Sequence, residues 1–388
     1  MSNVAVIIMA GGEGTRFYPL STPEHPKQFI DFFEDAPCLL KQTYERAQKI
    51  ARDEQIYFCT NAKYGEKIHN IIPNANLILE QKKKNTGPAL ANAMHKVFLH
   101  LKEKGFTAVC LPSDHYIANE EYYIKKIKEG IEIAEQGKIV TLGITPTEPS
   151  TEYGYIKPAN FSYKPSKIDA FVEKPNKDTA KTYVADGYLW NSGMFIWSYH
   201  TFMIELETHA PNLFKNIYSI KDYLEKMEPI SIDCLLMEKT RKGVVIPTHL
   251  DWSDLGNWGA LKAISKKIKL KPNIQAYVDR MVVKPWGYED RWAITRDYVG
   301  KLLYIKKGCR LSLQYHQIKD ETIMLIKGKM KLKFNTEDIV MVPGQTQKIA
   351  PTDIHRMEAL EDCVVVEVST IEIDDVVRVS DDYGREYK

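Results

Sequence analysis

The stretch Val4-Ala-Val-Ile-Ile-Met-Ala-Gly-Gly-Glu-Gly-Thr-Arg16 decides the fold, because an apolar run leads directly into a glycine-rich turn. The six residues Val4–Met9 are all apolar, which is typical of a buried strand. Gly11, Gly12 and Gly14 let the backbone approach a phosphate closely, so that successive N–H groups can cradle it. The stretch therefore indicates a strand followed by a phosphate-binding loop.

The end of this turn adds polar groups suited to phosphate. Thr15 supplies a hydroxyl and Arg16 a forked cation that matches phosphate oxygens. A dinucleotide fingerprint would need a third glycine where Phe17 stands, and a P-loop would need the segment GK[ST], which this turn lacks. A glycine-rich turn without a ligand is the remaining alternative from these residues alone.

Short apolar runs and amphipathic stretches alternate over the first two thirds of the chain. The stretches Pro88–Leu101 and Tyr122–Gln136 have helical spacing. The strand-like runs between the helical stretches are Ile56–Cys59, Leu77–Leu79, Ala108–Leu111 and Ile139–Gly143. This alternation predicts an α/β fold with a Rossmann-like, doubly wound sheet, in which ligands bind at the carboxyl ends of the strands.

The pattern changes near Lys266. Residues 266–280 are basic and contain a proline, which predicts a linker between a first domain, 1–265, and a second domain, 281–388. The second domain has short β-rich runs broken by Gly, Pro, Asn and Asp, as in a small all-β barrel or sandwich. Its strand-like runs are Lys301–Ile305, Thr322–Ile326, Met330–Phe334, Ile339–Val342 and Val364–Val368.

Composition limits the function classes. The 388 residues carry a net charge of +2, which argues against a nucleic-acid-coating surface, and 44% are hydrophobic, as in a globular protein. The six cysteines are scattered singly, which favours a reducing compartment over a disulfide framework. No apolar stretch is long enough for a membrane span and no leader pattern is visible, so we expect a cytoplasmic protein.

Further segments match one family in order. GGEGTRFYPLS with the following His25-Pro-Lys-Gln28 resembles the signature of sugar-1-phosphate nucleotidyltransferases, and the order of motifs is most similar to their mannose-1-phosphate guanylyltransferase branch. The resemblance covers about residues 4–262. The other matching segments are Asn85-Thr-Gly-Pro-Ala89, Pro112-Ser-Asp-His115, Tyr153-Gly-Tyr155, Val172-Glu-Lys-Pro175, Trp190-Asn-Ser-Gly-Met-Phe195, Met237-Glu-Lys-Thr240 and Trp252-Ser-Asp-Leu-Gly256.

The resemblance implies that a sugar phosphate attacks the α-phosphorus of a nucleoside triphosphate and that pyrophosphate leaves. Catalysis of this kind depends mainly on positioning and charge neutralisation. Arg16 and Lys27 are the candidates for holding the triphosphate. Asp114 and Asp254 are implied to share Mg²⁺, which prefers hard oxygen ligands. The implied substrates are GTP and mannose 1-phosphate.

The resemblance also implies a sugar-phosphate pocket. Lys174 is the candidate ligand of the sugar phosphate. Glu173 and Asn191 would hydrogen-bond sugar hydroxyls, since a wrong epimer leaves such groups unpaired. Tyr153 and Gly154 would line the same pocket.

The resemblance also implies that the segment leading into Asn85 contacts the base of the nucleotide, and we call this part of the site the nucleotide half. Glu80 and Lys84 flank this segment, and a carboxylate accepts well from the N1–H and N2–H₂ groups of guanine. The family usually has Arg where Lys84 stands. Trp190 and Phe195 are expected in the core, because alternation along a strand buries one face.

The second domain resembles the cupin-type phosphomannose isomerase module that is often fused to these guanylyltransferases. The cupin spacing implies the metal ligands Gln314, His316, Glu321 and His355, a donor set for Zn²⁺, Fe²⁺ or Mn²⁺. The histidine-rich family segment QMHHHRAEHW is changed here to QYHQIKDETI, and the β-helical connector of long bifunctional relatives is absent. The segments that carry the likeness are Lys284-Pro-Trp-Gly-Tyr288, Leu311-Ser-Leu-Gln-Tyr-His316, Val377-Arg378 and Asp382-Tyr-Gly-Arg385.

Several functions therefore stay open at this point. The chain could use another hexose 1-phosphate or nucleoside triphosphate. The cupin could add isomerase activity, or it could be a domain for dimerisation or effector binding. An all-β appendage with free strand edges makes a homodimer plausible.

Overall fold

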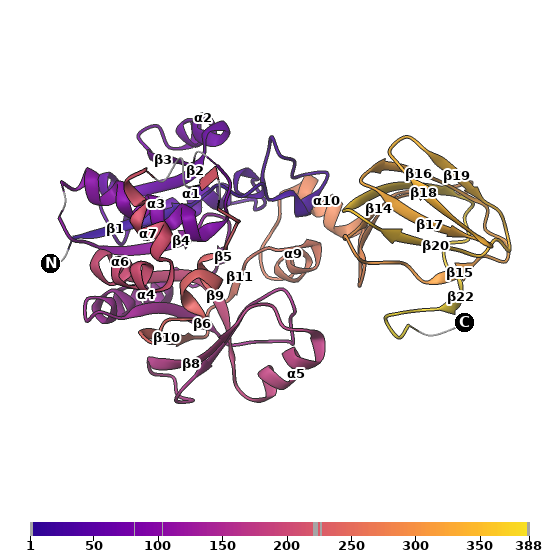
Figure 1. Cartoon of the computed structure of the whole chain (residues 1–388). Coiled ribbons are helices and arrows are strands. Elements are labelled where there is room, and N and C mark those ends of the chain that lie inside the picture. The colour runs from indigo at the N-terminus through magenta and orange to yellow at the C-terminus, as the bar shows by residue number, and fades with distance from the viewer. Residues whose placement is uncertain (1–2, 81, 103, 220–223, 226, 386–388) are drawn as a thin grey trace. The chain divides into compact units, whose positions relative to one another are not determined.

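The computed structural model describes residues 3–80, 82–102, 104–219, 224–225 and 227–385 (Figure 1). The chain divides into two compact units between Asn257 and Trp258. The second unit therefore begins before the predicted boundary at residue 265. Residues 266–280, predicted as a linker, contain helix α10 (Pro272–Arg280), and its Ile274 and Val278 are buried.

A nine-stranded mixed sheet forms the centre of the first unit. β1 pairs in parallel with both β2 and β4, β10 pairs in parallel with β6, and β9 is antiparallel to its neighbours β4 and β6. Along the sheet the strands are β3 (Asn76–Glu80), β2 (Ile56–Asn61), β1 (Val4–Met9), β4 (Thr107–Pro112), β9 (Leu189–Ser198), β6 (Ile139–Ile144), β10 (Gly243–Thr248), β8 (Ser166–Val172) and β7 (Tyr155–Pro158).

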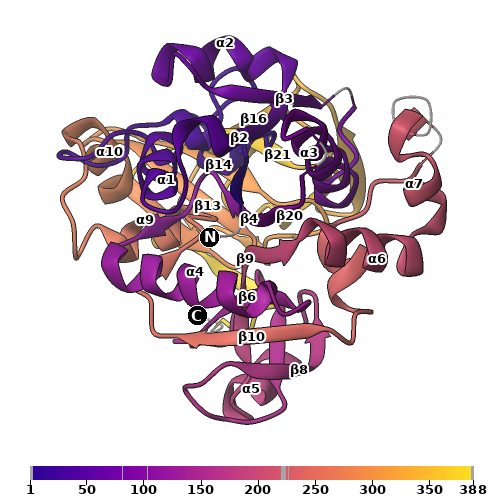
Figure 2. The ribbon, with the colours of Figure 1, turned by 90° about the vertical axis from the view of Figure 1, so that its left-hand side faces the viewer.

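Alternate residues of β1 belong to different hydrophobic clusters. Val6 and Ile8 pack into one cluster, and Ala5 and Ile7 pack into the other, because successive side chains point to opposite faces of a sheet. Figure 2 shows α3 and α6 on one side of the sheet and α1 and α4 on the other. The sheet is thus doubly wound, as predicted.

The helices of the first unit begin at polar caps where the sequence supplies them. The side chain of Asn119 accepts from the backbone N–H of Tyr122 at 3.0 Å and begins α4. The helices are α1 (Leu39–Gln48), α2 (Ala62–Ile71), α3 (Thr86–His100), α4 (Glu120–Ala134), α5 (Lys177–Ala185), α6 (Tyr199–His209) and α7 (Pro211–Lys215), with single turns η1 (Thr15–Phe17), η2 (Lys27–Phe29), η3 (Asp53–Gln55), η4 (Ile217–Ser219) and η5 (Asp233–Met237). A small ribbon joins β5 (Tyr116–Ile117) to β11 (Trp252–Ser253).

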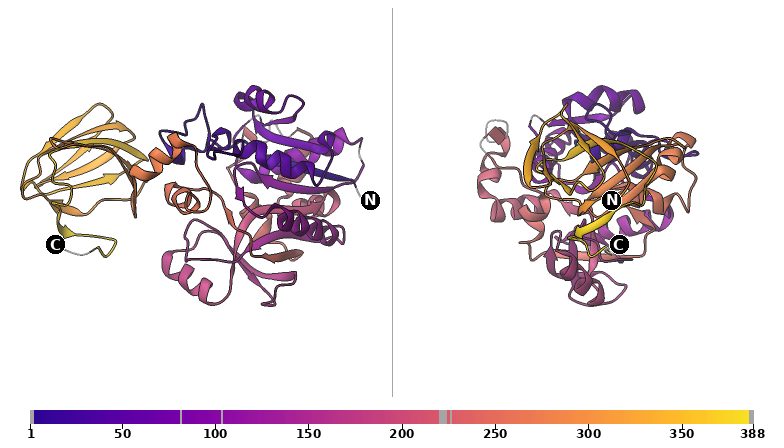
Figure 3. Two further views of the ribbon diagram at one scale, coloured as in Figure 1. Left: turned by 180° about the vertical axis from the view of Figure 1, so that it is seen from behind. Right: turned by 90° about the vertical axis from the view of Figure 1, so that its right-hand side faces the viewer.

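The second unit contains α9 (Trp258–Ile264), α10 and two antiparallel sheets, which Figure 3 shows face to face. Apolar side chains of both sheets, such as Leu303, Leu325 and Leu332, form its core. One sheet has the order β12 (Met281–Lys284), β13 (Gly287–Ile294), β14 (Val299–Ile305), β21 (Cys363–Ser369), β16 (Glu321–Lys327), β19 (Thr346–Ile349), and the other has the order β18 (Glu337–Met341), β17 (Met330–Phe334), β20 (His355–Ala359), β15 (Leu313–Tyr315), β22 (Val377–Ser380).

The predicted all-β second domain is confirmed, and each of its five predicted strand runs overlaps a strand. Among the described residues, no helix combines the length and the apolar character that a bilayer crossing requires.

Candidate functional site

A cavity of about 390 Å³ opens at the carboxyl ends of the parallel strands of the first unit. The loop after β1, the end of β3 and the segment after β4 all reach it, as expected for a doubly wound sheet. Most of the predicted site residues of this unit line the cavity, namely Gly11, Gly12, Gly14, Glu80, Asn85, Asp114, Tyr153, Gly154, Glu173, Asn191 and Asp254.

The backbone requires glycine at one position of the loop, Gly14, and a second glycine, Gly11, lies close to a side chain of the cavity. Gly14 has a φ of +47°, and a Cβ there would lie 2.8 Å from the backbone nitrogen of Lys27. A Cβ on Gly11 would lie 2.6 Å from Oε1 of Glu80. The buried Gln28 donates from Nε2 to the carbonyls of Ala10 (3.2 Å) and Gly12 (3.0 Å). The loop is thereby held against η2, and Gln28 is a positioning residue to which the sequence alone assigned no role.

An adjoining hollow of about 410 Å³ brings together Gly14, Arg16, Lys27, Asp114 and Asp254. The Arg16 guanidinium is exposed, with Nη1 at 3.8 Å from Oε2 of Glu152, so it is free to turn toward an anion. The side chain of Thr15, also predicted to bind phosphate, lies outside the described part of the structure.

Lys27 is buried and lies between the two predicted metal ligands. Its Nζ is 2.8 Å from Oδ2 of Asp114 and donates to the backbone carbonyls of Asp254 and Leu255, the second at 3.2 Å. Carboxylate and carbonyl oxygens thus surround the ammonium, and the same oxygens can attract a metal cation.

Asp114 is fixed by the residues around it. Burial by itself raises its pKa, but the charge of Lys27 outweighs burial and lowers the pKa below its ordinary value. Nδ1 of His115 accepts from Nε1 of Trp252 at 3.1 Å, which leaves the proton of the neutral ring on Nε2, 3.9 Å from Oδ1 of Asp114. Burial lowers the pKa of His115 to about 4, so this ring stays neutral near pH 7.

Asp254 is brought to the site by the ribbon of β5 and β11, in which Trp252 pairs with Ile117. Oδ1 of Asp254 accepts from the Tyr153 hydroxyl at 2.9 Å and from the backbone N–H of Gly256 at 3.0 Å. The ribbon therefore connects the segments after β4 and β10, which are far apart in the sequence.

The predicted sugar pocket contains one acidic residue that sequence reasoning missed. Asn191 donates from Nδ2 to Oδ1 of Asp233 at 2.9 Å, and both side chains line the cavity. Burial, with the nearby Glu173 carboxylate, raises the pKa of Asp233 to about 6. The signal available was its place just before the matching segment Met237-Glu-Lys-Thr240.

Gly154 allows Glu173 to enter this pocket, since a Cβ on Gly154 would lie 2.6 Å from Oε2 of Glu173. Lys174 has a positive φ of 42° and a side chain that is more than half exposed. Its Nζ lies 3.5 Å from Oε1 of Glu173, so the ammonium is at the edge of the pocket.

The nucleotide half differs from expectation at one residue. Nζ of Lys84 donates to the carbonyl of Met227 at 2.7 Å, and Lys84 does not line the cavity. The neighbouring Lys83 lines the cavity instead. Burial raises the pKa of Glu80 above its ordinary value. Asn85 also caps α3, accepting from the backbone N–H of Thr86 at 2.8 Å.

Trp190 and Phe195 are buried on β9, as expected of core residues. Phe195 also lines the cavity, so the core and the binding site share this ring.

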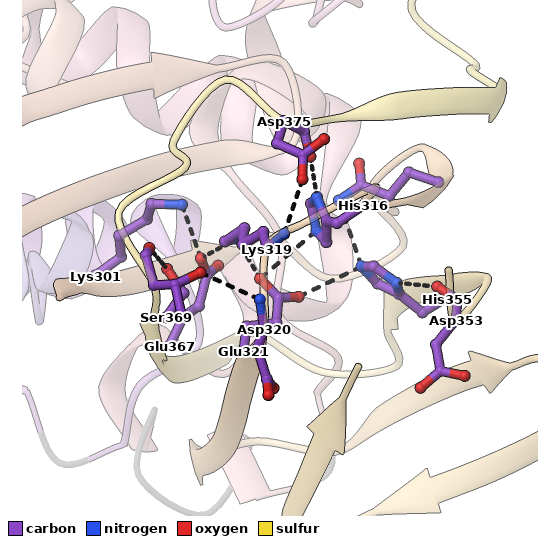
Figure 4. A network of polar contacts seen from close by, with 12 residues as sticks. Lys301, His316, Lys319, Asp320, Glu321, Asp353, His355, Glu367, Ser369 and Asp375 are labelled. Atoms are coloured by element: carbon purple, nitrogen blue, oxygen red, sulfur yellow. Dashed lines mark hydrogen bonds and ion pairs between the residues drawn. The ribbon is translucent and has the colours of Figure 1, made fainter. Parts of the chain in front are cut away.

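The second unit holds a buried cluster of His316, Glu321 and His355, whose candidate ligand atoms lie within 4.8 Å of one another (Figure 4). Nε2 of His316 is 3.6 Å from Oε2 of Glu321, and Nε2 of His355 is 3.5 Å from Oε1 of the same carboxylate. Gln314, the fourth predicted ligand, has Nε2 at 3.4 Å from Nε2 of His355. The structure thus brings all four predicted cupin ligands together.

Both rings of the cluster are oriented by backbone carbonyls. Nδ1 of His316 contacts the carbonyl of Asp375, and Nδ1 of His355 contacts that of Asp353 at 3.0 Å. A carbonyl can only accept, so each Nδ1 carries the proton and each Nε2 presents a lone pair to the cluster. Nε2 of His316 is buried and has no hydrogen-bond partner among the described residues. This arrangement fits a divalent metal ion.

Comparison with known proteins agrees with both units. Residues 5–271 match the family described as nucleotidyl transferase, and residues 272–381 match the one described as mannose-6-phosphate isomerase C-terminal. A mannose-1-phosphate guanylyltransferase of Salmonella montevideo is 29% identical over 475 aligned positions, which cover 98% of this chain and 100% of that protein. The alignment is longer than this chain, so the Salmonella protein has segments that this chain lacks.

Two solved structures are similar. The crystal structure of a mannose-1-phosphate geranyltransferase from Thermus thermophilus is 30% identical with a TM-score of 0.62, and the match covers 68% of this chain and 78% of that one. A mannose-6-phosphate isomerase from Helicobacter pylori is 27% identical with a TM-score of 0.54, and the match covers 65% of this chain and 99% of that one. The chain belongs to the nucleotidyl transferase family and is a nucleotidyltransferase, with a C-terminal β domain of the cupin-like mannose-6-phosphate isomerase type.

Proposed function

We propose that this chain transfers GMP from GTP to mannose 1-phosphate, giving GDP-mannose and pyrophosphate, with Mg²⁺ held by Asp114 and Asp254. One observation carries the proposal: the glycines of the phosphate loop, both aspartates and four of the five predicted sugar-binding residues line a single cavity. The names of the Salmonella and Thermus relatives support mannose 1-phosphate as the acceptor, and the Salmonella name supports the guanylyl donor.

The site residues fit Mg²⁺. The carboxylates of Asp114 and Asp254 line the same cavity, and the Lys27 ammonium already lies against Asp114 and the Asp254 carbonyl. Bound Mg²⁺ would neutralise phosphate charge during transfer.

The remaining groups of the chain position the triphosphate. Gly11 and Gly12 line the cavity, where backbone N–H groups of the loop can donate to phosphate oxygens. Lys27 can exchange Asp114 for a phosphate oxygen when the triphosphate enters, and the exposed Arg16 can turn toward the same group. Glu80 would accept from guanine at the other side of the cavity.

The reaction needs no covalent enzyme intermediate. An oxygen of the sugar phosphate forms a bond to the α-phosphorus, the bond between that phosphorus and the oxygen bridging to the β-phosphorus breaks, and pyrophosphate leaves with its electron pair. The attacking oxygen of the phosphate dianion carries no proton, so no general base is required. The chain supplies positioning and positive charge to bring two polyanions together.

Three polar side chains give the pocket the means to select a sugar. Glu173, Asn191 and Asp233 all line it, and hydrogen bonds to hydroxyls discriminate epimers because a wrong epimer leaves buried groups unpaired. Lys174 would pair with the phosphate at the pocket edge.

A substrate screen tests the proposal. Pyrophosphate release is measured with each of the four nucleoside triphosphates against several hexose 1-phosphates, with the Asp114→Asn variant as the blank. We expect the highest kcat/KM with GTP and mannose 1-phosphate, and no release without a divalent ion. A higher kcat/KM with another pair would replace the proposed substrates, and metal-independent release would remove the role of the aspartates.

The cluster in the second unit favours a second candidate function. We propose that Gln314, His316, Glu321 and His355 can hold Zn²⁺, Fe²⁺ or Mn²⁺, which would polarise the carbonyl of an open-chain sugar phosphate in an isomerase reaction. The Helicobacter structure, described as a mannose-6-phosphate isomerase, supports this candidate. Metal analysis of the full chain, with an assay of fructose 6-phosphate and mannose 6-phosphate interconversion, tests it. Metal-free protein without interconversion would leave transfer as the single proposed activity.

A further inference from the structure

Four charged side chains form a buried network beside the histidine cluster (Figure 4). Nζ of Lys319 contacts Oε2 of Glu321 and lies 2.7 Å from Oε1 of Glu367. Nζ of Lys301 lies 2.7 Å from the same Oε1 of Glu367. Each of these four side chains is 7% exposed or less.

The charges of this network already balance. Two lysine side chains face two carboxylates, and each lysine lies against at least one carboxylate. A divalent cation bound to Glu321 would add two positive charges to a buried neutral group. In a medium of low polarity such an excess is unfavourable, and the nearest positive charge is the Lys319 ammonium.

The Lys319 ammonium and the candidate metal position share one oxygen. Oε2 of Glu321, which the ammonium contacts, is also the oxygen 3.6 Å from the buried Nε2 of His316. A metal ion that uses His316 and this oxygen as ligands must therefore displace the ammonium or accept its repulsion.

The segment that carries Lys319 is held in place. The carboxylate of Asp375 accepts from the backbone N–H groups of Gln317 (3.1 Å), Ile318 (2.7 Å) and Lys319 (2.8 Å), while its carbonyl contacts His316. Lys319 therefore cannot leave by moving its backbone freely. Its side chain can still withdraw toward Glu367, which supplies an alternative partner.

We propose that Lys319 competes with a divalent metal ion for Glu321, with Glu367 as the partner that takes the ammonium when metal binds. Lys319 thereby sets the metal affinity of the cluster and keeps it lower than its donor atoms alone would give. The inference rests on the metal site proposed for the second unit and does not depend on the proposed transfer reaction.

The experiment measures the Zn²⁺ affinity of the full chain by competition with a chromophoric chelator. The His316→Ala variant lacks one proposed ligand and serves as the control for Zn²⁺ that binds at other positions of the chain. Lys319→Met removes the ammonium from Glu321, and we expect binding about tenfold tighter or more, because a buried competing charge is lost. Lys301→Met is the matched control. It also leaves Glu367 with one lysine but does not touch Glu321, so we expect a change of about threefold or less.

Three outcomes would overturn the proposal. Lys319→Met could bind Zn²⁺ no more tightly than the unmodified chain, the two lysine variants could tighten binding equally, or the added affinity could persist with His316→Ala. If Lys319→Met does not fold, Glu367→Gln gives the test with the opposite sign. It leaves the ammonium to Glu321 alone, so we expect weaker Zn²⁺ binding, and tighter binding would contradict the competition.

Discussion

Each unit of the molecule places a buried lysine against a carboxylate that is predicted to bind metal. In the first unit Nζ of Lys27 lies 2.8 Å from Asp114, and in the second unit Nζ of Lys319 contacts Glu321. The surroundings differ. Asp114 is partly exposed and lines a cavity of about 390 Å³, whereas the Glu321 side chain is 2% exposed and faces two imidazole rings.

The difference shows that a buried ion pair between a lysine and a carboxylate can have a different role in each unit. In the first unit an incoming triphosphate can take over the ammonium of Lys27, which leaves Asp114 available to a metal ion that arrives with the substrate. In the second unit the alternative partner of the Lys319 ammonium is Glu367, which belongs to the protein itself and does not arrive with a substrate. We therefore expect a substrate-dependent metal site in the first unit and a metal site weakened by its own lysine in the second.

The largest effect should follow from removing the predicted metal ligands of the first unit. Asp114→Asn and Asp254→Asn keep the side-chain volume but remove the charge, and we expect each to lower kcat for pyrophosphate release on the order of 10³-fold. Thermal unfolding checks that each variant is folded. Normal activity in either variant would show that its carboxylate does not serve the metal.

The two lysines should respond differently to the same substitution. Lys27→Met removes a cation from the transferring phosphates, and we expect kcat/KM for GTP to fall about 10²-fold or more. Lys319→Met should leave nucleotidyl transfer within about twofold, because its network lies entirely in the second unit. Steady-state kinetics of the two variants measures this contrast, and an equal loss in both would show that the units are coupled.

Much of the fold could be predicted because periodic apolar patterns specify it. The six apolar residues of β1 predict its bounds correctly, and the loop after them is identified by its glycines, of which the structure requires Gly14. The helix α10 was missed because the lysines just before it and the proline at its first position are typical of a linker, and its short apolar pattern is a weak helical signal.

The direction of side chains in loops could not be predicted. Nζ of Lys84 bonds to the carbonyl of Met227, 143 residues away, and no local pattern shows such a contact. Gln28 and Asp233 act through similar long-range contacts. By contrast, Asp114 and Asp254 could be found because each lies in a segment that matches the family. The Mg²⁺ ion, the cytoplasmic location and the homodimer stay predictions.

A smaller effect is expected at the edge of the cavity. Lys174→Ala removes the ammonium 3.5 Å from Glu173, and we expect the KM for mannose 1-phosphate to rise about tenfold, with KM for GTP unchanged. Lys181→Ala is a matched control, since Lys181 is also exposed and does not line the cavity. Its Nζ lies 2.9 Å from Oδ1 of Asp178. A defect confined to GTP would place Lys174 in the nucleotide half.

The smallest effect should be one of stability and should depend on pH. Burial, with Glu173 nearby, raises the pKa of Asp233 from 3.8 to about 6, so the folded protein disfavours the ionised carboxylate. This cost is fully present above pH 6 and disappears as the pH falls toward 4.

Asp233→Asn keeps an oxygen that can accept from Asn191 but removes the charge. We therefore expect the first unit to gain on the order of 1 to 3 kcal/mol in free energy of unfolding at pH 8, and less at pH 5. Urea unfolding at both pH values measures the gain. The same variant should raise the KM for mannose 1-phosphate, since Asp233 lines the cavity and contacts Asn191. A variant that is less stable at pH 8 than the unmodified chain would mean that the charge of Asp233 is compensated by its neighbours.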